Sequence, residues 1–207
     1  MARDILAATT NEGKIERYRK LIAHSGIFVV LHAPIELGIK NISAEENGAT
    51  LSENASMKAR AYFGAVDMPI LANDTGFYVE GEGLVDAPKR AALGARDEKN
   101  LSEEEKSELL IRFWQSMARK HGGRVDASWI DSFVLLLPNG DSRKSEARRE
   151  VILTDTIFGK THVQLPIRSL YISKATGKPA ALHTKEEDLQ ELLPISNALF
   201  HILRDEA

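Results

Sequence analysis

The segment Pro69–Val79 constrains the fold more than any other stretch of the chain. A short apolar run follows the proline and predicts a buried strand. The run stops at Asn73-Asp74-Thr75, and Gly76 then lets the backbone turn. Because ligand crevices in open α/β sheets lie at the carboxyl ends of strands, Asp74 at this place suits a bound cation. On this segment alone, the simpler alternative is favoured, a turn whose polar side chains cap the backbone.

Composition narrows the class of protein. The chain has 207 residues, enough for one well-buried domain or for one domain with a lobe attached. Its net charge of −3 gives no field that would attract nucleic acid or an anionic membrane. The absence of cysteine excludes disulfides, thiolate metal sites and cysteine nucleophiles. The first apolar run, Ile5–Ala8, is too short for a signal peptide, and no segment approaches a transmembrane span. We therefore expect a cytoplasmic protein without nucleic-acid or membrane partners.

The start of the chain has a pattern typical of a β-α-β unit. Residues 4–8 and 28–31 predict buried strands in a right-handed parallel pair, and an amphipathic helix connects them. The loop Thr9–Lys14 leads into that helix and offers hydroxyl, amide and ammonium groups beside the helix N–H groups, which suits an anion. It lacks the leading glycine and the Ser/Thr of a Walker A loop. The alternative is an N-cap followed by a solvated lysine.

Local patterns predict further elements along one α/β domain over residues 1–207. They are a long connection over 33–48, a helix over 51–63, an exposed loop over 80–88, a helix capped by Ser102, a β-hairpin over 129–153 around Asn139-Gly140, a strand over 165–172 and a last helix capped by Thr184 and broken at Pro194. The second hairpin strand is heavily charged, which predicts a solvated face or edge.

Three segments in this order resemble one known family. The segments are Thr9–Lys14, Glu45–Arg60 and Ala72–Gly76, and together they are similar to the inosine triphosphate pyrophosphatase family over the first eighty or so residues. The resemblance implies hydrolysis of non-canonical purine nucleoside triphosphates to the monophosphate and pyrophosphate. It also implies an elongated mixed α/β sheet with flanking helices, two lobes around a central cleft, a magnesium requirement and a homodimer.

The resemblance assigns five residues to the substrate. Thr9, Asn11 and Lys14 hold the triphosphate, Lys58 neutralises phosphate charge, and Thr75 occupies the place of a small hydroxyl residue of the family. Taken alone, Lys58 would be an ordinary exposed helix lysine.

The resemblance assigns the metal to two carboxylates. Glu46 is a magnesium ligand, and Asp74 serves the metal or the attacking water, so that Asp74, Lys14 and Lys58 form the predicted catalytic set. The chemistry is consistent, because magnesium takes a few carboxylates together with phosphates and waters, and cations neutralise the departing pyrophosphate. Taken alone, Glu46 would be a solvated loop acid.

Two departures from the family pattern affect the expected function. Asn73 replaces the first of two acids, and an amide carries no charge. In the C-terminal half, Leu165–Tyr171 and Leu193–Ile195 stand where the family has an aromatic segment and a Ser-His-Arg segment that recognise the base. Arg168, Tyr171 and His183 are candidate replacements, or surface and packing residues. We therefore expect altered or relaxed base specificity.

Two other functions stay open at this point. One is a nucleotide-binding protein without turnover, which Asn73 and the missing base segments favour and the complete set of lysines and carboxylates opposes. The other is a hydrolase of a different nucleotide phosphoanhydride. Metal-dependent turnover would exclude the first, and a substrate panel would identify the second.

Overall fold

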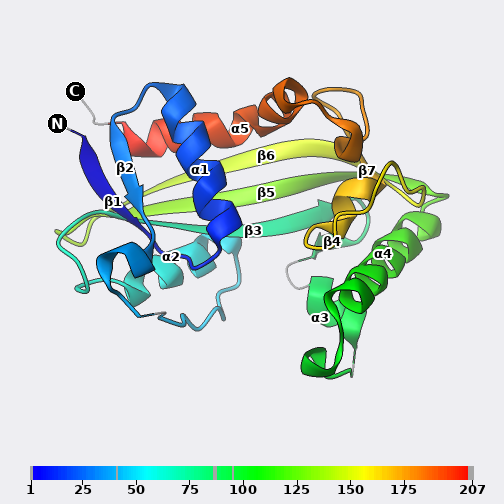
Figure 1. Ribbon diagram of the computed structural model, residues 1–207, viewed down its shortest axis with the longest axis horizontal. Helices are drawn as coiled ribbons and strands as arrows, with labels where there is room; N and C mark the ends of the chain where they lie inside the picture. Colours follow the sequence, from blue (N-terminus) through cyan, green and yellow to red (C-terminus); the bar gives the residue numbers. More distant parts are fainter. Residues whose placement is uncertain (1, 41, 86–87, 95, 205–207) are drawn as a thin grey trace. The chain divides into compact units, whose positions relative to one another are not determined.

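The computed structural model describes residues 2–40, 42–85, 88–94 and 96–204, and shows a mixed α/β fold (Figure 1). Its strands are β1 (Arg3–Ala7), β2 (Val29–His32), β3 (Ile70–Val79), β4 (Gly83–Val85), β5 (Arg124–Leu136), β6 (Ser142–Thr154) and β7 (Tyr171–Ser173). Its α-helices are α1 (Glu12–Ser25), α2 (Leu51–Ala61), α3 (Pro88–Leu93), α4 (Glu103–Lys120) and α5 (Lys185–Leu203). None of the helices in the described ranges is both long and apolar enough to cross a bilayer.

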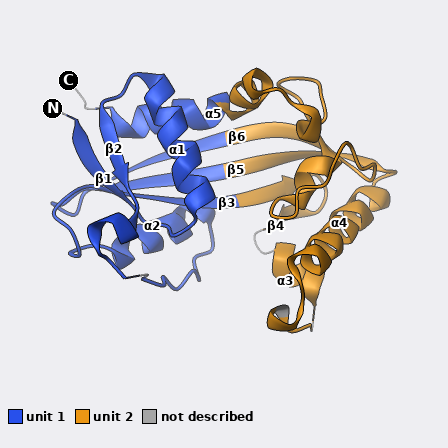
Figure 2. Ribbon diagram, viewed as in Figure 1, with its two compact units in different colours: residues 1–75, 131–147, 193–207 blue, residues 76–130, 148–192 orange. Residues whose placement is uncertain are grey.

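The chain divides into two compact units (Figure 2). Unit 1 comprises residues 1–75, 131–147 and 193–207, and unit 2 comprises residues 76–130 and 148–192. Strands β3, β5 and β6 and helix α5 each contribute residues to both units. The division therefore falls within regular elements, and no linker in the sequence marks it.

Unit 1 is built on the predicted β-α-β start, which the structure confirms. Strand β1 lies between β2 and β3 and pairs in parallel with both, with Ile5 opposite Leu31 and Leu6 opposite Ile70. Helix α1 covers one face of this sheet, where the ring of Tyr18 packs edge-on against Phe133 at a centroid distance of 5.5 Å.

Helix α2 packs against the other face of the same sheet. Its buried residues Ala55 and Ala59 belong to one apolar cluster with Ile70 and Ala72 of β3. Successive side chains of a strand point to opposite faces of the sheet. The odd-numbered side chains of β3 therefore point toward α1, and the even-numbered ones point toward α2.

Strand β3 overturns the expectation of a turn at Asn73–Gly76. The strand runs without interruption from Ile70 to Val79, and Gly76 is not among the glycines with positive φ. Ile70 and Leu71 pair with β1, Phe77–Val79 pair antiparallel with β4, and β5 is the neighbour on the other side of β3. Strand neighbours on both sides thus override the local preference of a polar, glycine-containing segment for a turn.

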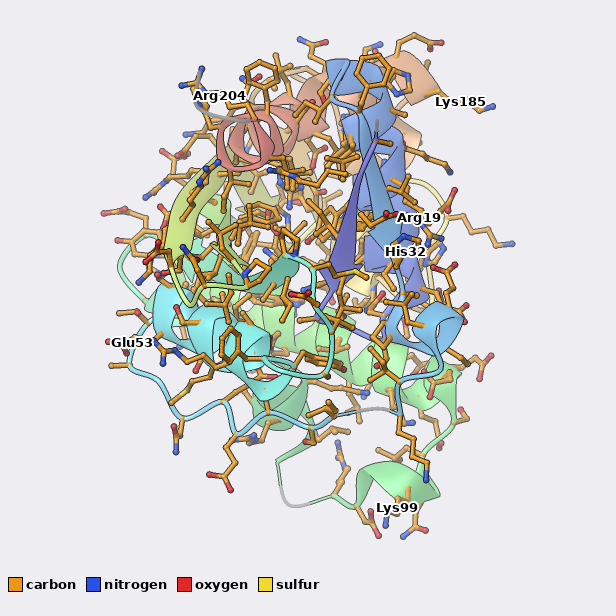
Figure 3. All side chains as sticks on the ribbon, turned by 90° about the vertical axis from the view of Figure 1, so that its left-hand side faces the viewer. Arg19, His32, Glu53, Lys99, Lys185 and Arg204 are labelled. Atoms are coloured by element: carbon orange, nitrogen blue, oxygen red, sulfur yellow. The ribbon has the colours of Figure 1, made fainter. Side chains whose placement is uncertain are left out.

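Strand β2 lies at the edge of the sheet in unit 1, and the side chain of Arg19 covers part of that edge (Figure 3). The Arg19 guanidinium donates two hydrogen bonds to the Leu31 carbonyl oxygen, at 2.9 and 2.7 Å, and one to Glu36 at 2.6 Å. The Ala33 N–H and Arg19 together hold the pKa of Glu36 below its usual value. A backbone acceptor at the open edge is therefore satisfied from within the chain.

Several predicted elements of the later chain are confirmed and others are wrong. The hairpin around Asn139-Gly140 is present, with the Leu137 N–H bonded to the Asp141 carbonyl at 2.8 Å. The expected strand over 165–172 is instead a 3-10 helix, Pro166–Leu170, followed by the short β7. The loop expected over 80–88 contains β4 within its described residues.

The expected break at Pro194 is also wrong, because α5 continues through the proline. The first turn has the predicted cap, since Glu187 N–H bonds Thr184 at 3.3 Å and Thr184 N–H bonds Glu187 at 2.9 Å. Beyond the proline, Ile195 and Leu199 are fully buried, and their packing offsets the hydrogen bond that the proline nitrogen cannot donate.

Unit 2 has an aromatic core on which helix α4 packs. Trp114 of α4 contacts Phe77 edge-on at a centroid distance of 5.1 Å, and Trp129 contacts the same ring at 4.7 Å. The apolar pattern of this helix predicts that Leu109, Leu110, Phe113 and Trp114 face a core, which is only partly right. Trp114, Met117 and Ala118 are buried, whereas Leu109 and Leu110 are half-buried.

The predicted solvated face of strand β6 is confirmed by its exposed Lys144, Glu146, Arg148 and Glu150, whereas Arg149 on the opposite face belongs to a buried charge cluster of unit 2. Arg149 donates to Glu191 at 3.2 Å, and the side chains of the two residues are only 7% and 3% exposed. The Tyr171 hydroxyl donates to the same carboxylate at 2.9 Å. Burial, and after it the charge of Glu191, raise the pKa of Tyr171 above its usual value, so Tyr171 remains a donor. His183 completes the cluster, with its Nδ1 3.3 Å from Glu191.

This cluster predicts a large stability effect of a single substitution. Glu191→Leu is expected to lower the free energy of unfolding by about 3 kcal/mol or more, because it leaves the buried Arg149 without this carboxylate. Urea denaturation measures the change. The double variant Arg149→Met/Glu191→Leu should lose less than the single variant, since it removes both charges. Equal losses would show that the pair contributes only packing.

Candidate functional site

The predicted site residues converge on one cavity of unit 1. The cavity has a volume of about 320 Å³, and its lining includes Thr9, Asn11, Lys14, Glu46 and Lys58. Strand β1 ends at Ala7 while β3 continues, so the cavity lies beyond the carboxyl end of β1, and Asn73 of β3 borders it. This is the place at which open α/β sheets bind ligands.

Two other hollows in unit 1 are larger but chemically poorer. One of about 400 Å³ and one of about 480 Å³ lie beside Arg19 and Glu36, which bind each other. The cavity beyond β1 instead brings two lysines and a carboxylate together with amide and hydroxyl groups.

The loop after β1 forms a capped helix start at the cavity. The Asn11 side chain accepts a hydrogen bond from Lys14 N–H at 3.0 Å, and Thr9 Oγ1 accepts one from Asn11 N–H at 3.2 Å. Both side chains use an oxygen for the cap, which leaves the Thr9 O–H and the Asn11 amide N–H groups able to donate to a ligand. The first-turn N–H groups and the positive end of the helix dipole add to an anion site.

The connection that carries Glu46 is attached firmly to helix α2. Thr50 and Glu53 form the predicted capping box, and Gly48 N–H donates to the Asn54 side chain at 2.9 Å. A Cβ atom at Gly48 would lie 2.7 Å from the Glu53 Cβ, so only glycine allows this close approach. The contacts of Gly48 with Glu53 and Asn54 thus hold the preceding segment against the start of α2, and this segment carries Glu46.

Lys58 of α2 lies between the two predicted metal ligands. Its ammonium is 2.7 Å from Asp74 Oδ1 and 3.0 Å from Glu46 Oε2. The side chains of Lys58 and Asp74 are 17% and 13% exposed, whereas that of Glu46 is 47% exposed. Two carboxylates from segments far apart in sequence therefore converge on one cation.

This donor set fits magnesium in the presence of a phosphate ligand. Within the described ranges, no group of three or more acidic or histidine side chains could hold a metal ion by itself. Magnesium, however, is commonly held by one or two carboxylates together with substrate phosphates and retained waters. Glu46 and Asp74 supply that number of carboxylates.

Lys14 of α1 contacts odd-numbered residues of β3. Its ammonium donates to Asn73 Oδ1 at 2.9 Å and to the Thr75 hydroxyl at 3.3 Å. Burial, followed by the charge of Lys58, lowers the pKa of Lys14 to about 8. Lys14 is therefore poised between its charged and neutral forms slightly above physiological pH.

The sequence prediction missed two contributions to the site. Asn73 stands where the family has an acid, but its amide makes hydrogen bonds that a carboxylate could not donate. It donates to the carbonyl oxygens of Asp74 and Ser132, both at 3.2 Å. Asp131 of β5 is fully buried and accepts a hydrogen bond from Thr75 at 2.8 Å. In the sequence Asp131 is the one acid in the run Trp129–Leu137, which is otherwise almost entirely apolar.

The candidate base-recognition residues lie in unit 2 and bind the carboxylates of Asp188 and Glu191. Arg168 forms an ion pair with Asp188, and His183 lies 3.2 Å from the same carboxylate. The His183 side chain has no exposed surface, and Tyr171 is 2% exposed. In this structure Tyr171 and His183 belong to the buried charge cluster, whereas Arg168 pairs with Asp188 at side-chain exposures of 28% and 39%.

Comparison with known families agrees with the N-terminal pattern. A model of the Ham1 family matches residues 5–145. A dITP/XTP pyrophosphatase of Staphylococcus epidermidis is 33% identical over 101 residues, which cover 47% of this chain and 49% of that protein. The corresponding protein of Yersinia pseudotuberculosis is 38% identical over 100 residues, with the same coverage of each chain. The chain thus matches about half the length of these curated relatives.

Comparison with solved structures extends over nearly the whole chain. A HAM1 protein from Coxiella burnetii superposes with a TM-score of 0.70 at 20% identity, covering 96% of this chain and 99% of that one. This likeness confirms the α/β fold, including the part of the chain where sequence similarity is weak.

The lowered pKa of Lys14 predicts a pH dependence of anion binding. Binding of inorganic triphosphate in the absence of metal is expected to weaken as the pH rises through about 8, because Lys14 loses its proton there. A bound anion stabilises the ammonium form of Lys14, so the pKa of Lys14 is higher in the complex than in the protein alone. Calorimetric titrations between pH 6 and 10 measure the effect.

The matched control is Lys14→Arg, whose guanidinium stays charged over this range. Titration of the ligand itself is common to both proteins and cancels in the comparison. The arginine variant should lose less affinity across the interval. An identical loss in both proteins would show that Lys14 does not carry the pH dependence.

Proposed function

The chain belongs to the Ham1 family, and we propose that it is a magnesium-dependent pyrophosphatase that hydrolyses nucleoside triphosphates to the monophosphate and pyrophosphate. The observation that carries the proposal is the cavity lined by Lys14, Lys58 and Glu46, together with the contact between Lys58 and Asp74. Lysines and a helix start attract a polyphosphate, and paired carboxylates attract its counter-cation. The relatives named dITP/XTP pyrophosphatases support the same reaction class.

The residues of the site divide the work between them. Thr9 and Asn11 donate hydrogen bonds to phosphate oxygens at the start of α1, where the helix dipole also favours negative charge. Lys14 and Lys58 neutralise the charge that develops on the departing pyrophosphate. Asp74 is the carboxylate best placed to accept a proton from the attacking water, because it is held beside the cavity by Lys58 at 2.7 Å.

Glu46 and Asp74 would hold the magnesium ion, with substrate phosphates and waters as its other ligands. When bound, magnesium polarises phosphoryl oxygens and neutralises their charge. The Lys58 ammonium already occupies the point on which both carboxylates converge, which supports a cation preference there.

Altered or relaxed base specificity is part of the proposal. The family match ends at residue 145, and the segments that stand where the family reads the base lie beyond it. Leu165 and Leu193 are exposed apolar residues in those segments, 40% and 55% exposed. Apolar groups reject a wrong base less strongly than buried hydrogen-bonding groups do. By family resemblance we also propose that the protein is cytoplasmic and forms a homodimer. Light scattering would test the dimer.

Asp74 provides the sharpest test of the reaction. Asp74→Asn is expected to lower magnesium-dependent pyrophosphate release on the order of 100-fold or more, because it removes a charge from the metal and the water. The measurement is pyrophosphate release with magnesium from inosine, xanthosine, deoxyuridine and the standard triphosphates. Asp141→Asn, in the exposed turn of the hairpin, is the matched control and should keep full activity.

The outcomes separate the three functions that the sequence left open. Pyrophosphate release from any triphosphate, lost in Asp74→Asn but not in Asp141→Asn, supports the proposal, and the ranking gives the base preference. Thermal stabilisation by a triphosphate without cleavage would support binding without turnover. Cleavage of another nucleotide phosphoanhydride alone would move the reaction to that substrate class.

A further inference from the structure

Asp131 is a buried carboxylate that the proposed mechanism does not yet use. It lies in β5 beside Ser132 and Phe133, and its exposed fraction is 0%. An ionised carboxylate in such a place costs several kcal/mol unless charges or hydrogen bonds compensate it. A residue of this kind needs a reason for its position, and its contacts lead to the candidate site.

The contact that connects Asp131 to the site is the hydroxyl of Thr75. Thr75 Oγ1 lies 2.8 Å from Asp131 Oδ1, 2.9 Å from Asn73 Oδ1 and 3.3 Å from the Lys14 ammonium. A hydroxyl has a single hydrogen to donate. Because the Lys14 ammonium already donates to Asn73 Oδ1 at 2.9 Å, the charged carboxylate is the better acceptor for the Thr75 hydrogen. The result is a chain in which Lys14 donates to Thr75 and Thr75 donates to Asp131.

The charges of the site are arranged in two groups on the two faces of β3. Lys58 binds Asp74 and Glu46 directly. Lys14 binds the neutral side chains of Asn73 and Thr75, with the charge of Asp131 behind Thr75. Burial and Lys58 lower the pKa of Lys14, and the charge of Asp131 opposes them.

We propose that Asp131 is the positioning residue of Lys14, and that its buried carboxylate acts through the Thr75 hydroxyl to hold the lysine ammonium toward the phosphate-binding cavity. The inference rests on the proposed function for the identity of the ligand. Thr75 of β3 then links Asp131 of β5 to Lys14 of α1 through its hydroxyl. It also explains how the site works with an amide at position 73, because the carboxylate is supplied from β5, on the other side of the same hydroxyl.

The geometry allows a direct test by moving the carboxylate. Asp131→Asn keeps the volume and an acceptor oxygen but removes the charge. The double variant Asn73→Asp/Asp131→Asn places the charge on the opposite side of the Thr75 hydroxyl, where Asn73 Oδ1 lies 2.9 Å away. The probe is inorganic triphosphate without metal, measured by calorimetry at pH 7, together with the thermal midpoint of each variant.

Asp131→Asn is expected to weaken triphosphate binding about tenfold, the scale of one hydrogen bond to a charged group. The double variant should recover most of that affinity. A purely structural residue would give a different result, with a lowered thermal midpoint, unchanged binding and no recovery in the double variant. That result, or a loss of binding that the relocated carboxylate does not restore, would overturn the proposal.

The test is independent of the proposed reaction. Inorganic triphosphate has no base and is measured without metal or turnover, so a recovery of binding supports the role of Asp131 even if no nucleotide is cleaved. Conversely, pyrophosphate release by the unmodified chain would support the reaction whatever the Asp131 variants show.

Discussion

Two lysine ammonium groups share one small cavity, and the rest of the site is arranged around their mutual repulsion. Partly buried like charges repel by several kcal/mol when they are close, so each needs its own compensation. Lys58 has two carboxylates in contact, whereas Lys14 has neutral side chains in contact and a lowered pKa. A polyanion that entered the cavity would relieve the repulsion of both lysines at once. The charge pattern therefore favours phosphates before any base is recognised.

The unbroken course of β3 is what allows neighbouring residues to serve different lysines. Asp74 and Thr75 are adjacent in sequence, yet they point to opposite faces of the sheet, one toward Lys58 of α2 and the other toward Lys14 of α1. A turn at this point would have placed both side chains on one loop, where neither helix fixes their separation. Rigid neighbours on both faces give the site its precision.

The sequence predicted the elements that depend on near neighbours and missed those that depend on distant ones. The capping box at Thr50 and the hairpin at Asn139-Gly140 are local, and both are confirmed. The turn predicted at Asn73–Gly76 and the break predicted at Pro194 failed, because strand pairing and helix packing overrode local preference. The family pattern predicted the residues that the structure brings together at the cavity. Asp131 was not found, because its partner lies on another strand and no local pattern shows the contact.

The guanidinium of Arg19 at the edge of β2 has a consequence for the behaviour of the protein in crowded solution. An exposed edge strand is a template for the addition of a strand from another molecule, which is how sheets grow into fibrils. Here the Leu31 carbonyl is already bonded to Arg19, which is itself held by Glu36. An incoming strand would have to break these contacts before it could bond to the Leu31 carbonyl. The Arg19 side chain thus opposes the addition of a foreign strand at the edge strand β2.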